Sequence, residues 1–296
     1  MAMSAWQQRP GIDTLMNQYQ EDTHAQFGNV RAVKEVSSVA NQLGRTRTLS
    51  EGYGAGGWDL RFEDMKRIGD WLYVLGINTL DQHLSYVSLR GVRNRDHPQS
   101  FSYHEPWWDA YHVSADYFAR LSLAMSAGQQ VNDVLVLEPT TTAWMYNAGG
   151  ENPPDLEKLG ESFQKLLLAR EAGWKRVDAA EVRGLLLAGA APGFTLTRAP
   201  GDRGILFHHR RRLDEGELVF LVNTSTEFRS AGSIESAARG VEEWDLASGV
   251  TRPYAFETAG RGTRFRFDLP EAGSLLLFLS AAKGAQVERP HDHGLG

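Results

Sequence analysis

The chain has 296 residues, of which 42% are hydrophobic and 23% are charged, with a formal net charge of −6. This length and apolar content suffice for one large or two ordinary domains with real cores, which excludes a mainly disordered chain. The acidic balance argues against nucleic acid as a partner. The absence of cysteine excludes disulfides, thiolate nucleophiles and Cys-ligated metal sites. No apolar run is long enough to cross a membrane and residues 1–6 lack the features of a signal peptide, so we expect a cytoplasmic protein with no membrane partner.

Residues 1–110 alternate helix and strand in the way that is typical of βα units on a parallel sheet. A short strand near residues 11–16 precedes a helix over 30–43, whose valines recur at helical spacing. A strand over 45–51 then opens into a loop, residues 52–57, that contains four glycines. A second helix over 62–75 and a second strand over 77–83 repeat the unit, and a long polar loop follows.

The remaining chain divides into three further segments. Residues 111–190 read as a small α/β region, with helices over 110–125 and 155–171 and a buried strand over 131–138. Residues 191–285 read as an antiparallel β-sandwich because short β segments alternate with turns rich in Gly, Pro and Asp. These strands are expected over 194–198, 205–210, 218–223, 241–245, 263–269 and 274–279. Residues 286–296 are expected to form a loose tail.

Glu51 and His83 are the first candidates for chemistry. Each ends a predicted parallel strand, and adjacent strands would bring both side chains to the same rim, where α/β folds place reactive groups. Such a histidine can bind a substrate hydroxyl, orient a carboxylate or act as an acid or base. The alternatives are a carboxylate that caps a turn or pairs with Arg45 or Arg47, and a histidine with a purely structural role.

The loop over 101–108 gathers aromatic rings around a second carboxylate, Glu105. The indole rings of Trp107 and Trp108 offer flat platforms for the C–H faces of sugars. The alternative is a loop that its tryptophans attach to the core while Glu105 is solvated.

Other chemistries have little support in the residues. The glycine loop fits neither the dinucleotide fingerprint nor the phosphate loop, and no Gly-x-Ser-x-Gly elbow occurs. His104 and His112 are spaced too widely for one helical turn, and His208 and His209 would face opposite sides of a strand. We therefore expect no metal and no cofactor.

Residues 49–58, 69–78 and 82–86 resemble the last part of the (β/α)₈ barrel of clan-A retaining glycoside hydrolases. The order of parts is similar to that of the β-galactosidases of family 42, in which a nucleophilic Glu ends the seventh strand and a Rossmann-like domain and a β-sandwich follow. Residues 116–120 and 133–137 resemble the Rossmann-like domain. Residues 219–225, 243–249 and 270–278 resemble the sandwich.

The resemblance implies a partial (β/α) barrel, a small Rossmann-like α/β region and a C-terminal antiparallel β-sandwich. The barrel is expected to be partial because a complete one needs about 250 residues, and Glu51 lies near the start of the chain. Glu51 matches the nucleophile, His83 the rim of the eighth strand, and Tyr53 and Trp58 the loop positions that line the sugar site. The strand that carries the acid/base Glu in this clan is then missing.

These inferences lead to a retaining glycosidase for O-glycosyl bonds, of β-galactosidase or β-glucosidase type, or a truncated relative. In this hypothesis Glu51 is the nucleophile, Glu105 the acid/base, and Asn78 and His83 hold hydroxyls. The sugar platform comprises Trp58, Trp107 and Trp108. The alternatives are a carbohydrate-binding protein without turnover and a purely structural protein. A partial barrel exposes strand edges, so we expect a homo-oligomer.

Overall fold

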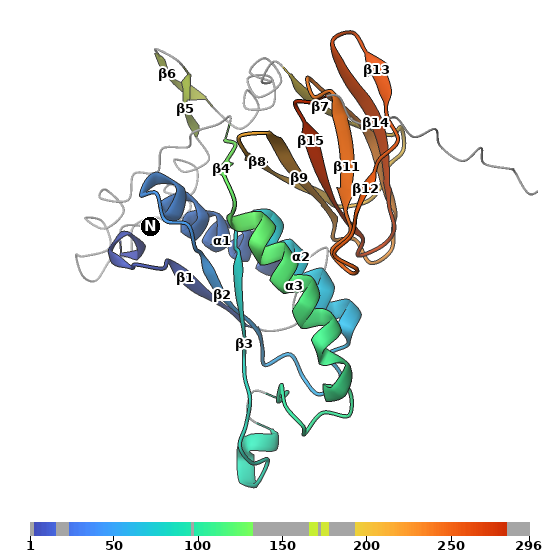
Figure 1. Cartoon of the computed structure of the whole chain (residues 1–296). Coiled ribbons are helices and arrows are strands. Elements are labelled where there is room, and N and C mark those ends of the chain that lie inside the picture. The colour runs from blue at the N-terminus through green and yellow to red at the C-terminus, as the bar shows by residue number, and fades with distance from the viewer. Residues whose placement is uncertain are drawn as a thin grey trace, which may run out of the picture.

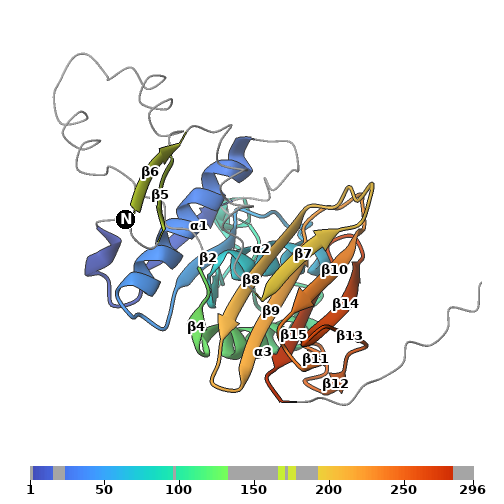
Figure 2. The same ribbon diagram turned by 90° about the horizontal axis from the view of Figure 1, so that it is seen from above.

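A computed structural model of the chain describes residues 3–15, 24–95, 98–132, 166–170, 173–177 and 193–282. A small parallel sheet lies on one side, an antiparallel sandwich lies on the other, and helix α2 contacts both (Figures 1 and 2). The helices are α1 (His24–Gln42), α2 (Phe62–Leu75) and α3 (Tyr111–Ser126), with short 3₁₀ turns at Ser4–Trp6, Gly91–Asn94 and Trp108–Ala110. Within these ranges, no helix combines the length and apolarity needed to cross a membrane.

The parallel sheet has the order β1-β2-β3, formed by Gly11–Leu15, Leu49–Gly54 and Thr79–Gln82. The chain passes from β1 to β2 through α1 and from β2 to β3 through α2, which confirms the predicted βα alternation. A Cβ built on Gly52 would lie 2.7 Å from Leu80 and 3.7 Å from Leu72 of α2, so this row of the sheet faces the helix. Side chains alternate along a strand, and Glu51 therefore faces the opposite side of the sheet.

Helix α2 forms where the sequence predicts it, because its apolar residues recur on one face. Met65, Ile68, Leu72 and Leu75 are buried. Gly76 ends the helix in the left-handed conformation, with φ of 115°. A Cβ at this glycine would lie 2.1 Å from the hydroxyl oxygen of Ser37, so α1 also approaches too closely for a side chain.

One apolar core joins the helices to the sandwich. Tyr73 of α2 and Phe118 of α3 pack with ring centroids 5.7 Å apart, and both belong to a cluster that includes Phe220 and Leu276 of the sandwich. Helix α3 thus packs into the same apolar core as helix α2 and the larger sheet of the sandwich. The domain boundaries expected near residues 110, 190 and 285 stay predictions.

The sandwich consists of two antiparallel sheets. The larger has the order β12-β11-β15-β9-β8-β4 and the smaller the order β13-β14-β10-β7. The strands are β4 (Gln129–Gln130), β7 (Phe194–Arg198), β8 (Leu206–Arg212), β9 (Gly216–Asn223), β10 (Ser230–Ser236), β11 (Gly240–Trp244), β12 (Thr251–Pro253), β13 (Glu257–Ala259), β14 (Gly262–Leu269) and β15 (Ser274–Ser280). All six predicted strands form, and β4, β10, β12 and β13 are additional.

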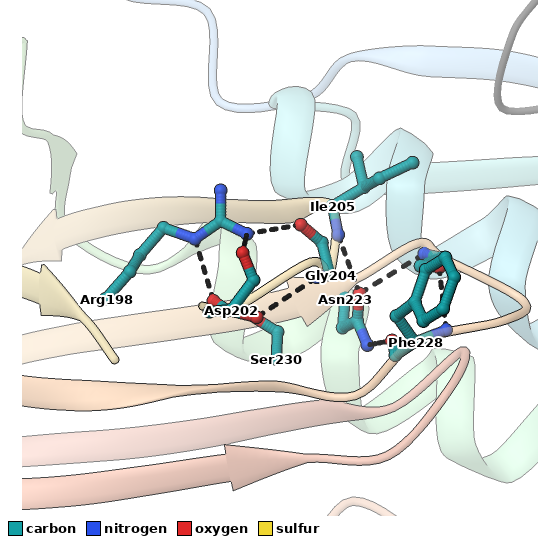
Figure 3. A network of polar contacts seen from close by, with 8 residues as sticks. Arg198, Asp202, Gly204, Ile205, Asn223, Phe228 and Ser230 are labelled. Carbon is teal, nitrogen blue, oxygen red and sulfur yellow. Dashed lines mark hydrogen bonds and ion pairs between the residues drawn. The ribbon is translucent and has the colours of Figure 1, made fainter. Parts of the chain in front are cut away.

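A buried polar network closes one end of the sandwich (Figure 3). The Asn223 side chain accepts from the N–H groups of Ile205 and Ser225 at 3.0 and 3.2 Å and donates to the carbonyls of Phe228 and Pro270 at 2.8 and 2.9 Å. All four hydrogen-bonding positions of this amide are therefore filled, which makes its burial favourable.

The helix predicted over residues 155–171 is wrong for 166–170. Strand β5 (Leu166–Arg170) pairs there with β6 (Gly173–Val177) in an antiparallel hairpin. A short apolar run is compatible with either structure, and its spacing alone cannot separate them. The rest of that helix, most of the strand expected over 131–138 and the tail over 286–296 lie outside the described residues.

Candidate functional site

His83 directly follows β3 at the carboxyl-terminal edge of the parallel sheet, and Glu51, the third residue of β2, lies beside it within the sheet. The expectation that this strand ends at Glu51 is wrong, because β2 continues to Gly54. Strand β2 pairs with β3 in register, with Glu51 opposite Asp81, and His83 follows the end of β3. The Nε2 atom of His83 lies 3.5 Å from Oε1 of Glu51. The Glu51 side chain is 37% exposed and that of His83 is 19% exposed, so a ligand can reach the carboxylate while the histidine holds it.

Backbone hydrogen bonds fix the strand ends on both sides of this pair. The hydroxyl of Thr14 on β1 donates to the carbonyl of Glu51 at 2.8 Å. The N–H of His83 donates to the carbonyl of Gly52 at 2.9 Å. Hydrogen bonds from or to neighbouring strands thus fix the main chain at Glu51 and His83, as a preorganised site requires.

The segment over residues 98–101 lies across the loops that follow β2 and β3. The carbonyl of Pro98 accepts from the N–H of Gly57 at 3.0 Å, and the side chain of Gln99 donates to the carbonyl of Tyr53 at 3.1 Å. On the other side, the N–H of Phe101 donates to the carbonyl of Leu84 at 2.9 Å. This segment therefore belongs to the same rim as Glu51 and His83.

Glu105 follows this segment and is only 5% exposed. Burial raises the pKa of its carboxyl group, while the N–H of Ser100 opposes the rise by donating to Oε1 at 3.4 Å. A carboxyl whose pKa is raised keeps its proton closer to neutral pH, which is the property that a general acid needs.

The three tryptophans of the expected sugar platform differ in exposure. Trp58 and Trp108 are 39% and 37% exposed, and Trp108 stacks on Tyr111 with ring centroids 5.4 Å apart. Trp58 donates its indole N–H to the carbonyl of Asn94 at 2.8 Å, which fixes the ring. Trp107 instead packs edge-on against Phe62 and anchors its loop to the core.

The structure does not bring Asn78 and Tyr53 to the rim. Asn78 is buried just before β3, at the amino-terminal edge, where its side chain accepts from the N–H of Thr48 at 3.0 Å and donates to the carbonyl of Thr46 at 2.9 Å. Tyr53 is buried too, and its hydroxyl donates to the carbonyl of Met65 at 2.8 Å. Both polar groups serve the fold, so neither is presented to a ligand.

Two carboxylates near Glu51 were missed by sequence reasoning. Asp13 on β1 and Asp81 on β3 are the register partners of Glu51 in the neighbouring strands. In-register neighbours in a sheet are about 4.8 Å apart, and their side chains leave the same face. The alternation of the strand over 77–83 could have pointed to Asp81, but register with Glu51 follows only from the paired strands.

A metal site does not emerge from these groups. No set of three or more His, Cys, Asp or Glu side chains with a metal-binding arrangement occurs in the described part of the chain.

Comparisons with known proteins find similarity to parts of two proteins that are named as glycosidases. No protein-family model matches the sequence. The chain is 30% identical over 139 residues to a protein of Formosa agariphila named "Putative beta-glucuronidase", a match that covers 44% of this chain and 11% of that protein. The structure of the present chain superposes on a rhamnosidase from Novosphingobium sp. PP1Y with a TM-score of 0.68 and 18% identity. The match covers 98% of this chain and 36% of the rhamnosidase chain. The chain thus shares its fold with a part of that rhamnosidase and spans a minor share of either protein's length.

Proposed function

We propose that this chain carries a glycoside hydrolase site in which Glu51 is the nucleophile. The observation that supports this most is the position of Glu51 on the middle strand of a parallel sheet, 3.5 Å from His83, which follows the next strand at the carboxyl-terminal edge. Reactive groups of α/β enzymes occupy this edge. The similarity to a protein named as a β-glucuronidase and the fold likeness to a rhamnosidase lend support of a different kind.

The parallel sheet is, in this proposal, part of a (β/α) barrel of the clan-A type. Strands β1 to β3 with helices α1 and α2 have the alternation of such a barrel. The helices contact one another and the sheet on one face, and Glu51 lies on the other face, which corresponds to the barrel interior.

The reaction proposed is retaining hydrolysis of an O-glycosyl bond, of β-galactosidase or β-glucosidase type. A carboxylate oxygen of Glu51 attacks the anomeric carbon and forms a glycosyl ester while the bond to the leaving oxygen breaks. The leaving oxygen takes the proton of Glu105. Water then gives a proton to the Glu105 carboxylate and attacks the anomeric carbon, which releases the sugar and restores both carboxyl groups. His83 orients Glu51 throughout.

Glu105 suits the acid role because burial raises the pKa of its carboxyl group, and its segment is hydrogen-bonded to the loops that flank Glu51. Retaining hydrolysis places the two carboxyl groups about 5–5.5 Å apart. The loop that carries Glu105 therefore has to bring it to that distance in the substrate complex.

The test is hydrolysis of dinitrophenyl β-galactoside, β-glucoside, β-glucuronide and α-rhamnoside by the wild type and by Glu51→Gln. These leaving groups need little protonation, so the assay isolates the nucleophile. We expect Glu51→Gln to lower kcat/KM at least about 10³-fold for any glycoside that the wild type hydrolyses. Glu63→Gln, which changes an exposed carboxylate at the start of α2, is the matched control and should retain activity. Activity that survives Glu51→Gln would overturn the assignment.

Glu105→Gln separates the two carboxyl roles. We expect it to slow alkyl glycosides, whose leaving oxygen needs a proton, about 10²–10⁴-fold, while dinitrophenyl glycosides are slowed far less in the bond-breaking step. Equal losses on both kinds of substrate would contradict an acid role for Glu105.

A carbohydrate-binding protein without turnover is the second candidate. It is favoured by the rings of Trp58 and Trp108, which are 39% and 37% exposed and so leave aromatic surface open to a ligand. In that case sugar binding by calorimetry would survive Glu51→Gln and fall in Trp108→Ala, and no glycoside would be hydrolysed.

A further inference from the structure

A pocket of about 520 Å³ lies at the amino-terminal edge of the parallel sheet, at the opposite end from Glu51. Two chain segments form it, one before β1 and one between α1 and β2. The lining residues are Gln8, Arg9, Gly44, Arg45, Thr46 and Arg47. Its volume falls in the range of small-molecule sites.

The described residues that line this pocket carry charge of one sign. Three of them are arginines and none of those described is acidic, although the chain as a whole has a net charge of −6. Within the described part of the chain, neither Arg9 nor Arg45 takes part in an ion pair, whereas many arginines of the sandwich do. Like charges that face a shared pocket repel one another, and an anion bound between them would remove that repulsion.

The main chain holds the two segments together. The N–H of Leu49 donates to the carbonyl of Pro10 at 2.9 Å, next to Arg9. The N–H of Arg45 donates to the carbonyl of Ala40 at 2.8 Å, so the turn after α1 is fixed as well. Arg47 donates from its guanidinium to the carbonyl of Asn78 at 3.3 Å. The backbone that carries the three arginines is therefore fixed on both segments.

Arg45 follows the end of α1, where the last helical carbonyls carry partial negative charge. The positive charge of Arg45 is therefore partly offset by these carbonyls. The guanidinium groups of Arg9 and Arg47 remain, and guanidinium binds phosphate and sulfate through paired, charge-assisted hydrogen bonds.

We infer that this pocket binds a tetrahedral oxyanion, phosphate or sulfate, either free or as an ester on a small molecule. The site is separate from the glycosidase site, since its lining residues precede β1 and β2, whereas Glu51 lies within β2 and His83 follows β3. The inference does not depend on the proposed hydrolysis.

The experiment is calorimetric titration of the full chain at low ionic strength with inorganic phosphate, inorganic sulfate, glucose 6-phosphate and glucose. We expect saturable binding of the anions in the millimolar range or tighter and no binding of glucose. The double variant Arg9→Gln/Arg45→Gln should weaken anion binding at least about 10-fold. Arg261→Gln, an exposed arginine in the turn between β13 and β14, is the matched control and should leave it unchanged.

The ester and the free ion are distinguished by their relative affinities. Tighter binding of glucose 6-phosphate than of phosphate identifies an anionic sugar as the ligand class, and equal affinities identify the ion itself. The inference is overturned if the wild type binds none of these anions, or if the double variant, shown by its melting temperature to be folded, binds them as well as the wild type does.

Discussion

The parallel sheet and the antiparallel sandwich of this chain bury their strands to different extents. In β9 every residue from Leu218 to Asn223 is buried, because α2 covers one face and the smaller sheet covers the other. In β3 no residue is fully buried, and Glu51, the third residue of β2, is partly exposed. The sandwich thus contains a strand that is buried on both faces. The parallel sheet, which helices cover on one face, leaves polar side chains of the other face accessible for chemistry.

The largest expected contrast is between a core residue of the sandwich and the carboxylate of the site. Phe267→Ala should lower the free energy of unfolding by about 3–5 kcal/mol, because the ring is buried and leaves a cavity. Glu51→Gln should change it by less than about 1 kcal/mol, since the side chain is partly exposed. Urea unfolding of both variants measures the contrast, and a similar loss in both would contradict this division of roles.

The buried network at the end of the sandwich gives the next effect. Asn223→Ala should cost about 2–3 kcal/mol, because two backbone N–H groups and two carbonyls lose their partner inside the protein. Asn41→Ala, at an exposed hydrogen bond to Gln130, is the control and should change stability little. Comparable small losses in both variants would show that water replaces the Asn223 amide.

His209 connects the two regions and makes their association sensitive to acid. It lies buried on β8, with Nδ1 3.2 Å from the carbonyl of Val74 on α2. Burial, with the nearby cations of Lys34 and Arg211, lowers the pKa of His209 to about 3. The native state therefore keeps this histidine neutral at pH values where the unfolded chain, with a histidine pKa near 6.5, takes up a proton.

The free energy of unfolding should consequently be unaffected by His209 above pH 6.5 and fall as the pH drops from 6.5 toward 3. The slope from this group is at most about 1.4 kcal/mol per pH unit. His209→Gln should remove that slope between pH 6 and 4.5, which urea midpoints across this interval can show. Carboxylates such as Asp202, whose pKa is lowered, lose their contribution only in stronger acid. An unchanged slope in His209→Gln would contradict this assignment.

The smallest expected effect belongs to the partly exposed ring of Trp108. Trp108→Ala should raise KM or the sugar Kd about 2–10-fold, as expected for one lost ring contact, with little loss of stability. Trp6→Ala removes a ring that is 88% exposed near the chain's start, and serves as the control. Equal effects of the two substitutions would exclude Trp108 from the sugar platform.

Local pattern was sufficient for the βα frame. Helix α2 could be predicted to its end residues because its apolar spacing and Gly76 are local signals. The proximity of Glu51 and His83 followed from strand order, but β2 continues to Gly54, so Glu51 lies inside its strand and not at its end. Self-association stays a prediction, although β1 and β3 do form the two edges of the described parallel sheet.

The direction of individual polar side chains could not be predicted in the same way. Asn78, expected within the strand over 77–83, precedes β3, and its amide is satisfied by main-chain groups some thirty residues away in sequence. Tyr53 turns inward because a carbonyl of α2 accepts its hydroxyl. The register of Asp81 with Glu51 also depends on pairing between strands. Such contacts arise only when distant segments meet, and residue spacing carries no record of them.

The nucleophile is tested most directly by trapping it. The full chain is incubated with the 2-deoxy-2-fluoro form of whichever dinitrophenyl glycoside it hydrolyses, and the labelled peptide is identified by mass spectrometry. The fluorine slows breakdown of the glycosyl ester, so the sugar should remain on one peptide, with the added mass on Glu51 and none in the Glu51→Gln variant. A label on another carboxylate, or turnover of the parent glycoside with no trapped ester, would contradict the central role of Glu51.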